Sequence, residues 1–491
     1  MSASCPAAQG FVPQGDEFRA NTFTAGTQRY PSMGLGAAGD LVLAWTSAEQ
    51  DGSGFGVFAQ RYDAVGAAQG PEFRVNTATT SFQAYPSVAV DPDGDVTVVW
   101  QSFGQDGGHF GVYGQRYAAT GEPRGGEFRV NTTTQGSQGG PAVAVDADGD
   151  LVVVWSSEAQ DGSGYGVYGQ RYDAAGAARG GEFQVNTTTE GVQAFPSVAV
   201  DADGDAVVVW SSEFQDGSGL GIYGQRYDAA GGAQGAEFRV NEATAGNQSL
   251  PSVALDADGD FAVTWSSDEQ DGSGGGIYAR RYDAGGAVQG AEFQVNTTTV
   301  GNQANPTAAL DAAGGLVVVW SSDGQDGNSY GVYARRYDAS GVARSGELPV
   351  NTATANFQGF PVVGADARGG VAVVWESLDQ DGSEFGVYAQ RYGAAPVAAE
   401  PSVPAAAALA LVPNPVGAGG GRVRYALAAP GLVRVTVSDV LGRIVAVLAD
   451  GERPAGPHEA RFETGGLAPG VYVVRLEADA SQTVCRVTVV R

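Results

Sequence analysis

Apolar and polar positions alternate in short runs along residues 1–395. The clearest copy of the pattern, 196–241, reads PSVAV, DADGD, AVVVWSSE, FQDGSGLG, IYGQRYD, AAGGAQGA and EFRVN. Runs rich in Val, Phe, Tyr and Trp alternate with clusters of Gly, Asp and Ser, which is typical of strands joined by turns. No stretch of the repeat spaces apolar residues three, four and seven apart, so we expect no helix there. The pattern predicts four strands, at 196–200, 206–213, 221–228 and 237–241.

This four-strand unit recurs with a fixed period of 55 residues. The seven tryptophans of the chain occur at positions 45, 100, 155, 210, 265, 320 and 375. A fixed period of this size indicates a repeat architecture, and four antiparallel strands per repeat are typical of a propeller blade. We therefore predict an all-β fold, with a seven-bladed β-propeller over residues 1–395.

The two ends of the repeat region predict how the ring closes. The seventh copy lacks its fourth strand, because its third strand, 386–392, runs directly into GAAPVAAEP. The missing EFxVN segment occurs instead at Glu17–Asn21, where Phe18 precedes Phe73 by one period of 55 residues. We expect this N-terminal strand to complete the last blade and to remove an exposed sheet edge.

A different pattern follows the repeats. Residues 396–410 are rich in Ala and Pro, which indicates a linker. Residues 411–491 carry alternating runs such as RVRYAL, VRVTV and VYVVRLE, separated by Gly or Pro turns. This spacing predicts a β-sandwich of about seven short strands, as in immunoglobulin-like domains.

The segment 411–491 resembles a known family. The motifs PNP, DVLGR, AGPH and LAPGVY occur in this order, and they resemble those of the C-terminal sorting domain of the bacterial type IX secretion system. The motif residues are Pro413, Asn414, Pro415, Asp439, Gly442, Arg443, Gly470 and Tyr472. The resemblance implies export through the type IX machinery, to the medium or to the outer-membrane surface of a Gram-negative bacterium. It implies no catalytic residue.

Two further features bear on export. The repeats resemble a widespread class of bacterial secreted repeats that often occur in large surface proteins. Residues 1–10, MSASCPAAQG, have neither the basic start nor the apolar core of a signal peptide, which departs from the pattern of the sorting-domain family.

The composition of the chain limits the classes of partner that we expect. The formal net charge is −28, so we expect the surface to repel nucleic acid and anionic membranes. The apolar run Ala405–Val412 is too short to span a bilayer. The two cysteines, Cys5 and Cys485, lie near opposite ends, so a disulfide framework is not expected. We expect the propeller to be monomeric.

The Gln-Asp-Gly loop between the second and third strands is a candidate binding site. Its polar residues are Gln50, Asp51, Gln105, Asp106, Gln160, Asp161, Gln215, Asp216, Gln270, Asp271, Gln325, Asp326, Gln380 and Asp381. One interpretation is a cation or glycan site repeated around the ring, on the face that also carries the connections between blades. The alternative is an Asp-Gly turn in which Asp caps its own loop.

The DADGD turn between the first and second strands is a candidate metal site. Its acidic residues are Asp91, Asp93, Asp95, Asp146, Asp148, Asp150, Asp201, Asp203, Asp205, Asp256, Asp258 and Asp260. Alternating Asp can supply oxygen ligands to Ca²⁺, although the twelve-residue calcium loop with its terminal Glu is absent. Asp-Gly between apolar strands is also a hairpin signal. We expect no required cofactor, and Ca²⁺ is the candidate ligand.

Two other repeated features have structural interpretations. Tryptophans on the rim could stack on sugars, but Trp210 ends a Val run, which favours packing in the core. The repeated Arg-Tyr pair could bind carboxylates, but we expect each Arg to contact an acid or carbonyl of the neighbouring blade.

Catalysis is not expected from this sequence. Different residues must meet at one point, whereas a repeat places every special residue seven times. His109 is the single histidine of the repeats and is expected at the surface, and no Ser-His-Asp set, zinc spacing or phosphate loop is visible. We expect a binding or scaffold module for polysaccharide or a surface protein, with avidity from repeated sites. The alternatives are a purely structural surface or adhesion component, and a carbohydrate-active enzyme built from differences between blades.

Overall fold

The structure is a computed structural model that divides into two compact units, Met1–Ala395 and Pro396–Arg491. It describes residues 11–394, 409–412, 421–427, 431–439, 443–454, 456–462, 464, 467–468, 470–478 and 481–489. Every regular element in these ranges is a β-strand. Within the same ranges, no helix is long and apolar enough to cross a membrane.

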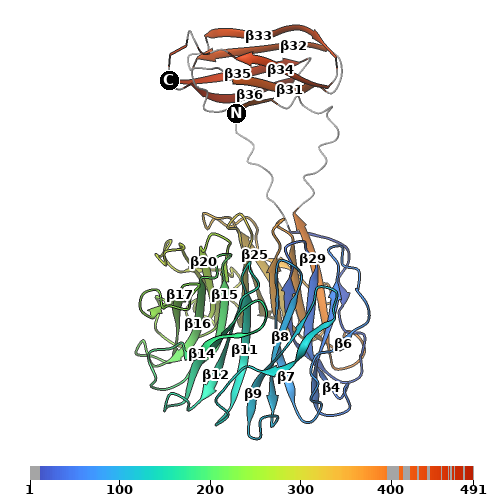
Figure 1. Ribbon diagram of the computed structural model, residues 1–491, viewed down its shortest axis with the longest axis vertical. Coiled ribbons are helices and arrows are strands. Elements are labelled where there is room, and N and C mark those ends of the chain that lie inside the picture. Colours follow the sequence, from blue (N-terminus) through green and yellow to red (C-terminus); the bar gives the residue numbers. More distant parts are fainter. Residues whose placement is uncertain are drawn as a thin grey trace. The chain divides into compact units, whose positions relative to one another are not determined.

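The first unit consists of repeated antiparallel sheets, one for each copy of the sequence pattern (Figure 1). In the fourth copy the strands are β15 (Gln193–Val200), β16 (Ala206–Glu213), β17 (Leu220–Tyr227) and β18 (Phe238–Arg239), paired in that order. The four predicted strands are therefore confirmed.

The outer strand is shorter than the EFRVN pattern predicts. The strand itself contains only Phe238 and Arg239, and the backbone contact with β17 ends at the next residue, where the Val240 N–H donates to the Ile222 carbonyl at 2.8 Å. Asn241 contacts the same strand through its side chain, because its Oδ1 accepts the Ile222 N–H at 2.8 Å. A side-chain bond thus extends the backbone ladder by one residue at this end of the strand.

The other sheets repeat this order. The first strands are β3 (Gln28–Leu35), β7 (Gln83–Val90), β11 (Gln138–Val145), β19 (Gln248–Leu255), β23 (Gln303–Leu310) and β27 (Gln358–Ala365). The second strands are β4 (Leu41–Ala48), β8 (Val96–Phe103), β12 (Leu151–Glu158), β20 (Phe261–Asp268), β24 (Leu316–Asp323) and β28 (Val371–Leu378). The third strands are β5 (Phe55–Tyr62), β9 (Phe110–Tyr117), β13 (Tyr165–Tyr172), β21 (Gly275–Tyr282), β25 (Tyr330–Tyr337) and β29 (Phe385–Ala394). The outer strands are β6 (Phe73–Arg74), β10 (Pro123–Arg129), β14 (Ala178–Gln184), β22 (Phe293–Gln294) and β26 (Leu348–Pro349).

The sheets form a closed ring, a β-propeller. The first strand of each sheet contacts the first strand of the next sheet, and β27 contacts β3. We number the sheets along the chain, so that blade 1 begins with β3 and blade 7 with β27. The first strands therefore lie nearest the axis of the ring.

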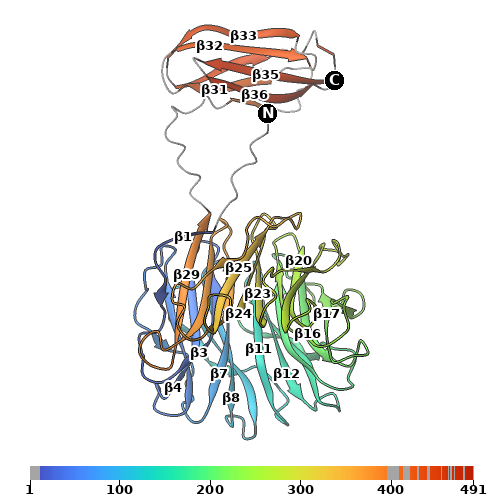
Figure 2. The same cartoon turned by 180° about the vertical axis from the view of Figure 1, so that it is seen from behind.

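The N-terminal segment completes blade 7, as the sequence predicts. β2 (Phe18–Arg19) pairs with β29, and Phe18 lies opposite Ala389. β1 (Phe11–Pro13) pairs with the end of the same strand, with Phe11 opposite Ala394, which the sequence analysis did not foresee. Figure 2 shows the blue β1 beside the orange β29.

The apolar core lies between neighbouring blades. Trp210 of blade 4 packs with Val152 and Val154 of blade 3, and each of the seven Trp side chains is 0% exposed. The interpretation of these tryptophans as core residues is confirmed. Because replacing a buried Trp with Ala costs about 3–5 kcal/mol, the seven indoles are a major source of ring stability.

The blade geometry defines two ends of the propeller. At one end lie the turns that join first to second strands and third to outer strands, and we call it the turn end. At the other end lie the Gln-Asp-Gly loops and the connections between blades, and we call it the loop end. The turns with the DADGD pattern and the Gln-Asp-Gly loops thus lie at opposite ends.

The second unit is a separate pair of sheets. One sheet contains β30 (Leu409–Val412), β31 (Gly421–Leu427) and β34 (Gly456–Phe462), and the other contains β32 (Gly431–Asp439), β33 (Ile444–Arg453), β35 (Gly470–Ala478) and β36 (Ser481–Val489). Residues from both sheets share one buried cluster that includes Val423, Phe462, Val435 and Leu476. β30 begins inside the segment 396–410 that the sequence predicts as a linker, and 396–408 lies outside the described residues. The immunoglobulin-like classification of this unit stays a prediction.

Candidate functional site

The Gln-Asp-Gly loops at the loop end use their Asp side chains within the protein. In blade 3, Asp161 Oδ1 accepts the Ser163 N–H at 3.2 Å, and Asp161 Oδ2 accepts Asn186 Nδ2 at 3.3 Å. The corresponding cap is formed by Asp51, Asp216, Asp271, Asp326 and Asp381. Asp106 differs, since neither of its buried carboxylate oxygens has a partner among the described residues. The geometry is that of an Asp-capped turn in six of the seven loops.

The Gln side chains of these loops contact a ring of glutamates that the sequence analysis did not single out. Gln215 Nε2 donates to Glu237 of the same blade, and Glu237 Oε2 accepts the Thr187 N–H at 2.6 Å and the Thr187 hydroxyl at 2.9 Å. Thr187 follows the outer strand of blade 3, so the carboxylate joins two blades. We call this arrangement the glutamate latch. Its seven members are Glu17, Glu72, Glu127, Glu182, Glu237, Glu292 and Glu347.

The latch favours the ionised form of a glutamate whose carboxylate accepts several hydrogen bonds. Burial raises the pKa of Glu347, but donors from Thr297, Thr298 and Gln325 lower it, and the net pKa lies below its usual value. A carboxylate held in this way stabilises the contact between blades and is not available as a general acid near neutral pH.

A layer of buried amides lies beneath the latch. Asn186 Oδ1 accepts the buried Val167 N–H at 2.7 Å, and its Nδ2 donates to the Thr188 carbonyl at 2.8 Å and to Gln193 Oε1 at 3.3 Å. Gln193 is 0% exposed. The signal was present in the sequence, because Asn and Gln recur at these two positions in every copy.

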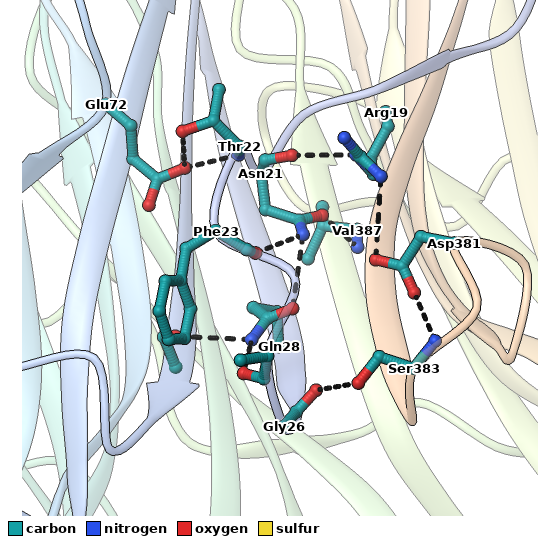
Figure 3. Close-up of polar contacts among 12 residues, drawn as sticks. Arg19, Asn21, Thr22, Phe23, Gly26, Gln28, Glu72, Asp381, Ser383 and Val387 are labelled. Atoms are coloured by element: carbon teal, nitrogen blue, oxygen red, sulfur yellow. Dashed lines mark hydrogen bonds and ion pairs between the residues drawn. The ribbon is translucent and has the colours of Figure 1, made fainter.

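Figure 3 shows the copy of this network where the ring closes. Thr22, which follows β2, donates to Glu72 of blade 1, and Asn21 Oδ1 accepts the Val387 N–H at 2.8 Å. Asp381 caps the Ser383 N–H at 3.1 Å and lies 3.9 Å from Arg19 Nη1. The N-terminal strand is thus held by the same contacts as the outer strands of the other blades.

The acidic side chains at the turn end also cap their own turns. Asp201 Oδ1 accepts the N–H groups of Asp203 at 3.0 Å and Asp205 at 2.9 Å, and Asp205 Oδ1 accepts the Ala229 N–H at 2.9 Å. Asp203, the middle residue, is exposed. Its counterparts Asp93, Asp148 and Asp258 are exposed too.

No set of three Asp, Glu, His or Cys side chains in the described ranges comes together in a way that could hold a metal ion. Burial raises the pKa of the first Asp of each complete turn, and backbone donors only partly offset this. These residues are Asp91, Asp146, Asp201 and Asp256. Four of these turn-capping carboxylates and Asp366 border a cavity of about 280 Å³ where the first strands end.

The repeated Arg-Tyr pair bridges blades at the turn end. Arg171 Nη2 of blade 3 donates to the carbonyls of Gly204 at 3.2 Å and Ala229 at 3.0 Å, both in blade 4. The expected contact between Arg and a neighbouring carbonyl is confirmed here. Arg336 of blade 6 instead donates to Asp311 of its own blade at 2.5 Å.

A β-bulge near the loop end gives the first strands an unusual backbone. In blade 1, Arg29 lies opposite Thr46 and Ser32 lies opposite Ala44, so two residues face one on β4. The first of these two residues has a positive φ in every blade. They are Tyr30 (54°), Tyr85 (53°), Gly140 (60°), Phe195 (56°), Leu250 (54°), Asn305 (54°) and Phe360 (49°). A non-glycine residue there is strained, and such strain is common at ligand sites.

The bulge side chains of three adjacent blades meet. The ring centroids of Tyr30 and Tyr85 are 4.2 Å apart, and those of Tyr30 and Phe360 are 6.3 Å apart. Equivalent residues of neighbouring blades can touch only near the axis, so these rings lie at the inner rim of the loop end. Burial first, and then the neighbouring Tyr30, raises the pKa of Tyr85 to about 12.

One junction between blades, from blade 7 to blade 1, departs from the others. Glu376 has a side chain that is 0% exposed, and Arg29 donates to it through Nε at 3.1 Å and Nη2 at 2.7 Å. Glu376 Oε2 also accepts the N–H of the bulge residue Tyr30 at 3.1 Å. At the junction of blades 3 and 4, Ser156 Oγ accepts the Phe195 N–H instead.

Burial raises the pKa of Glu376, and Arg29 only partly offsets this. Burial lowers the pKa of Arg29, but the hydrogen bonds and charge of Glu376 outweigh it and leave the pKa above its usual value. Alignment of the copies at the 55-residue period would have found the pair, because Arg29 replaces small residues such as Ala194, and Glu376 replaces Ser156.

The remaining predicted residues lie as follows. His109 is exposed in the loop of blade 2. Pro413, Asn414, Pro415 and Gly442 lie outside the described residues.

Four sorting-motif residues are described in part. The backbone of Asp439 ends β32 opposite Tyr472, Arg443 is exposed, and Gly470 begins β35. Tyr472 is buried, and its hydroxyl donates to the Ala468 carbonyl at 2.9 Å.

No protein-family model matches the chain, and no curated protein matches it in sequence. The chain is similar in fold to a protein of unknown function from Dyadobacter fermentans, with 11% identity, a TM-score of 0.48, and coverage of 78% of this chain and 98% of that chain. It is similar to the β-propeller domain of the Trilobed protease from Pyrococcus furiosus, with 11% identity, a TM-score of 0.45, and coverage of 76% and 97%. It is also similar to PorZ, a surface component of the type IX secretion system of Porphyromonas gingivalis, with 15% identity, a TM-score of 0.40, and coverage of 96% and 61%. At these identities, no activity of these proteins is assigned to this chain.

Proposed function

We propose that the protein is a non-catalytic binding or scaffold module that is secreted or displayed on the cell surface. The observation that supports this most directly is the loop end, where the repeated polar groups already bond to one another. Asp161, Glu237 and Asn186, like most of their copies, are used to hold the ring together. We therefore propose that binding takes place at the inner rim of the loop end rather than at the Gln-Asp-Gly loops.

The same contacts weigh against a glycosidase. Glycoside hydrolysis usually needs two carboxyl groups that flank the bond to be cut. Glu376, the carboxylate that distinguishes one junction, is fully buried and paired with Arg29. We expect no reducing sugar to be released when the full chain is incubated with neutral polysaccharides, and measurable release would contradict the proposal.

We propose that the second unit exports the propeller through the type IX machinery. The motif resemblance of 411–491 supports this, as does a core of its own that includes Val435 and Phe462. The test is expression behind a cleavable signal peptide in a type IX-competent bacterium, beside a chain that ends at residue 395. The full chain should reach the surface or medium, and the shortened chain should stay in the periplasm. Equal export of both chains would refute this part of the proposal.

A further inference from the structure

Aromatic side chains gather over one part of the loop end. Ring centroids lie 5.5 Å apart for Tyr330 and Phe357, 5.9 Å for Phe357 and Phe385, and 6.1 Å for Phe357 and Phe360. From Phe360 the series continues to Tyr30 and then to Tyr85. We call these six residues, which span blades 6, 7, 1 and 2, the aromatic arc.

The aromatic residues of the arc are not present in every copy of the repeat. Blade 7 places Phe385, Phe357 and Phe360 at three positions of the 55-residue period. At the same three positions, blade 2 has Phe110, Phe82 and Tyr85, whereas blade 5 has Gly275, Asn247 and Leu250. The core and latch residues of the same blades do repeat, so ring assembly does not require aromatic residues at these positions.

The arc presents its rings to solvent on a constrained backbone. Tyr85 is 40% exposed, and the other five side chains are partly exposed. Tyr30, Tyr85 and Phe360 are all bulge residues with positive φ. Bulges re-aim side chains, and strained conformations of this kind persist where the surrounding structure fixes them.

One polar group lies within the arc. The Arg29 guanidinium is 4.1 Å from the Phe385 ring centroid and 5.0 Å from that of Tyr30. Its side chain is 27% exposed, and its hydrogen bonds to Glu376 in the described structure use Nε and Nη2. Nη1 takes no part in these bonds, so it is the donor that we assign to a bound molecule.

The charges indicate a neutral ligand. Arg29 and Glu376 form a pair without net charge, and the chain as a whole carries −28. Glu17 and Glu72 of the latch lie at the same end of the propeller. An anion would be repelled by this field. A cation would have to compete with the Arg29 guanidinium, which already occupies the face of Phe385.

We propose that the aromatic arc binds a neutral saccharide chain. Ring faces are negative and pack well against the C–H faces of sugar rings, while one precisely placed donor fixes orientation at a hydroxyl. A protein partner is disfavoured, since a stable interface needs roughly 800 Å² on each side, more than six partly buried rings offer. The inference deepens the proposed binding function and rests on it.

The test is titration calorimetry of the full chain with cellopentaose, maltopentaose, xylopentaose and mannopentaose, and with trigalacturonate as the charged comparison. Saturable binding of at least one neutral pentasaccharide is expected, with weaker or no binding of trigalacturonate. If none of the four neutral sugars binds, or if trigalacturonate binds best, the inference is overturned.

Two variants locate the site. Tyr85→Ala should weaken binding about tenfold or more, in line with the loss of a stacked aromatic partner. Phe195→Ala is the matched control, because Phe195 is the bulge residue of blade 4, is 58% exposed and lies outside the arc. Equal affinity of Tyr85→Ala and the native chain would overturn the site and leave the proposed binding function standing. Melting curves establish that both variants are folded.

A third variant tests the donor. Arg29→Ala combined with Glu376→Ser reproduces the junction of blades 3 and 4, where Ala194 and Ser156 stand at these positions. The fold should persist, and affinity for the neutral sugar should fall severalfold. Unchanged affinity would remove Arg29 from the site. Export is measured separately, so its failure is distinguishable from failure of this inference.

Discussion

The latch network and the aromatic arc share one end of the propeller but follow opposite rules. The latch is repeated at every junction, and its members, such as Glu237 and Asn186, bond within the protein. The arc occurs at one part of the ring, where its partly exposed rings lie beside the Arg29–Glu376 ion pair that no other junction of the described propeller has. Repetition here serves assembly, and the places where repetition fails are where a specific site can form.

Breaking the Arg29–Glu376 ion pair, at the junction of blades 7 and 1, should lower the free energy of unfolding more than any other change that we propose. Arg29→Ala leaves the carboxylate of Glu376 buried without its cation, so the free energy of unfolding at pH 7 should fall by about 3–5 kcal/mol. The measurement is urea denaturation of the native and variant chains. The double variant Arg29→Ala, Glu376→Ser should recover most of this loss, because no unpaired charge is left buried. Failure to recover would show that the ion pair itself stabilises the fold.

The Arg29→Ala loss should also depend on pH. With Arg29 gone, only the Tyr30 N–H opposes the effect of burial on Glu376, and the pKa of Glu376 in the folded state lies above its unfolded value of about 4.3. The penalty is therefore present above the folded pKa and disappears as the pH falls below the unfolded one. Urea midpoints of native and variant chains should converge between pH 7 and pH 4, whereas parallel curves would contradict the assignment.

Breaking one copy of the repeated network should cost less. Asn186→Ala removes the acceptor of the buried Val167 N–H and the donor to Gln193, so unfolding free energy should fall by about 1–3 kcal/mol. Thr187→Ala, which removes a more exposed donor of the latch above it, is the matched control and should change stability by less. Equal losses of unfolding free energy for the two substitutions would mean that the burial of the amide layer does not determine its contribution to stability.

The latch carboxylate itself should have a smaller, pH-dependent effect. Glu347→Gln should lower the unfolding free energy by about 1 kcal/mol at pH 7, because a charged acceptor of several donors becomes neutral. The pKa of Glu347 is lowered in the fold, so its stabilisation is present above the ordinary Glu pKa and is lost as the pH falls through the folded value. Thermal melting at pH 7 and pH 3 would reveal whether the difference shrinks as expected.

Added calcium should change the stability of the protein least. The carboxylates of Asp201 and its copies accept hydrogen bonds from the backbone of their own turns. Among the described residues, the exposed Asp203 does not join two other acidic side chains in a group that could hold a metal ion. Added Ca²⁺ should therefore leave the melting temperature unchanged within about 1 °C, since a ligand stabilises only what it binds. A rise with a defined stoichiometry by calorimetry would restore the metal interpretation of the DADGD turns.

The local pattern of strands and turns, together with the 55-residue period, was enough to predict the ring. It was not enough to predict contacts between single residues that lie far apart in the sequence. Alternating runs give strands, the 55-residue spacing gives blades, and the position of Phe18 gives the closure. The Asp-rich motifs allowed two interpretations, because a turn and a metal loop use the same side chain. Arg29 and Glu376 are 347 positions apart, and only ring closure brings them together.

The closure of blade 7 has a mechanical consequence. β1 and β2 pair with β29 in antiparallel fashion, and Phe11 lies opposite Ala394 at the end of that pairing. A tension applied outward through residues 11 and 394 would open these bonds one after another, like a zipper, instead of loading them all at once. A tethered propeller under such a pull would yield first along this seam, while the other six sheets, each made from a continuous stretch of chain, remain unloaded.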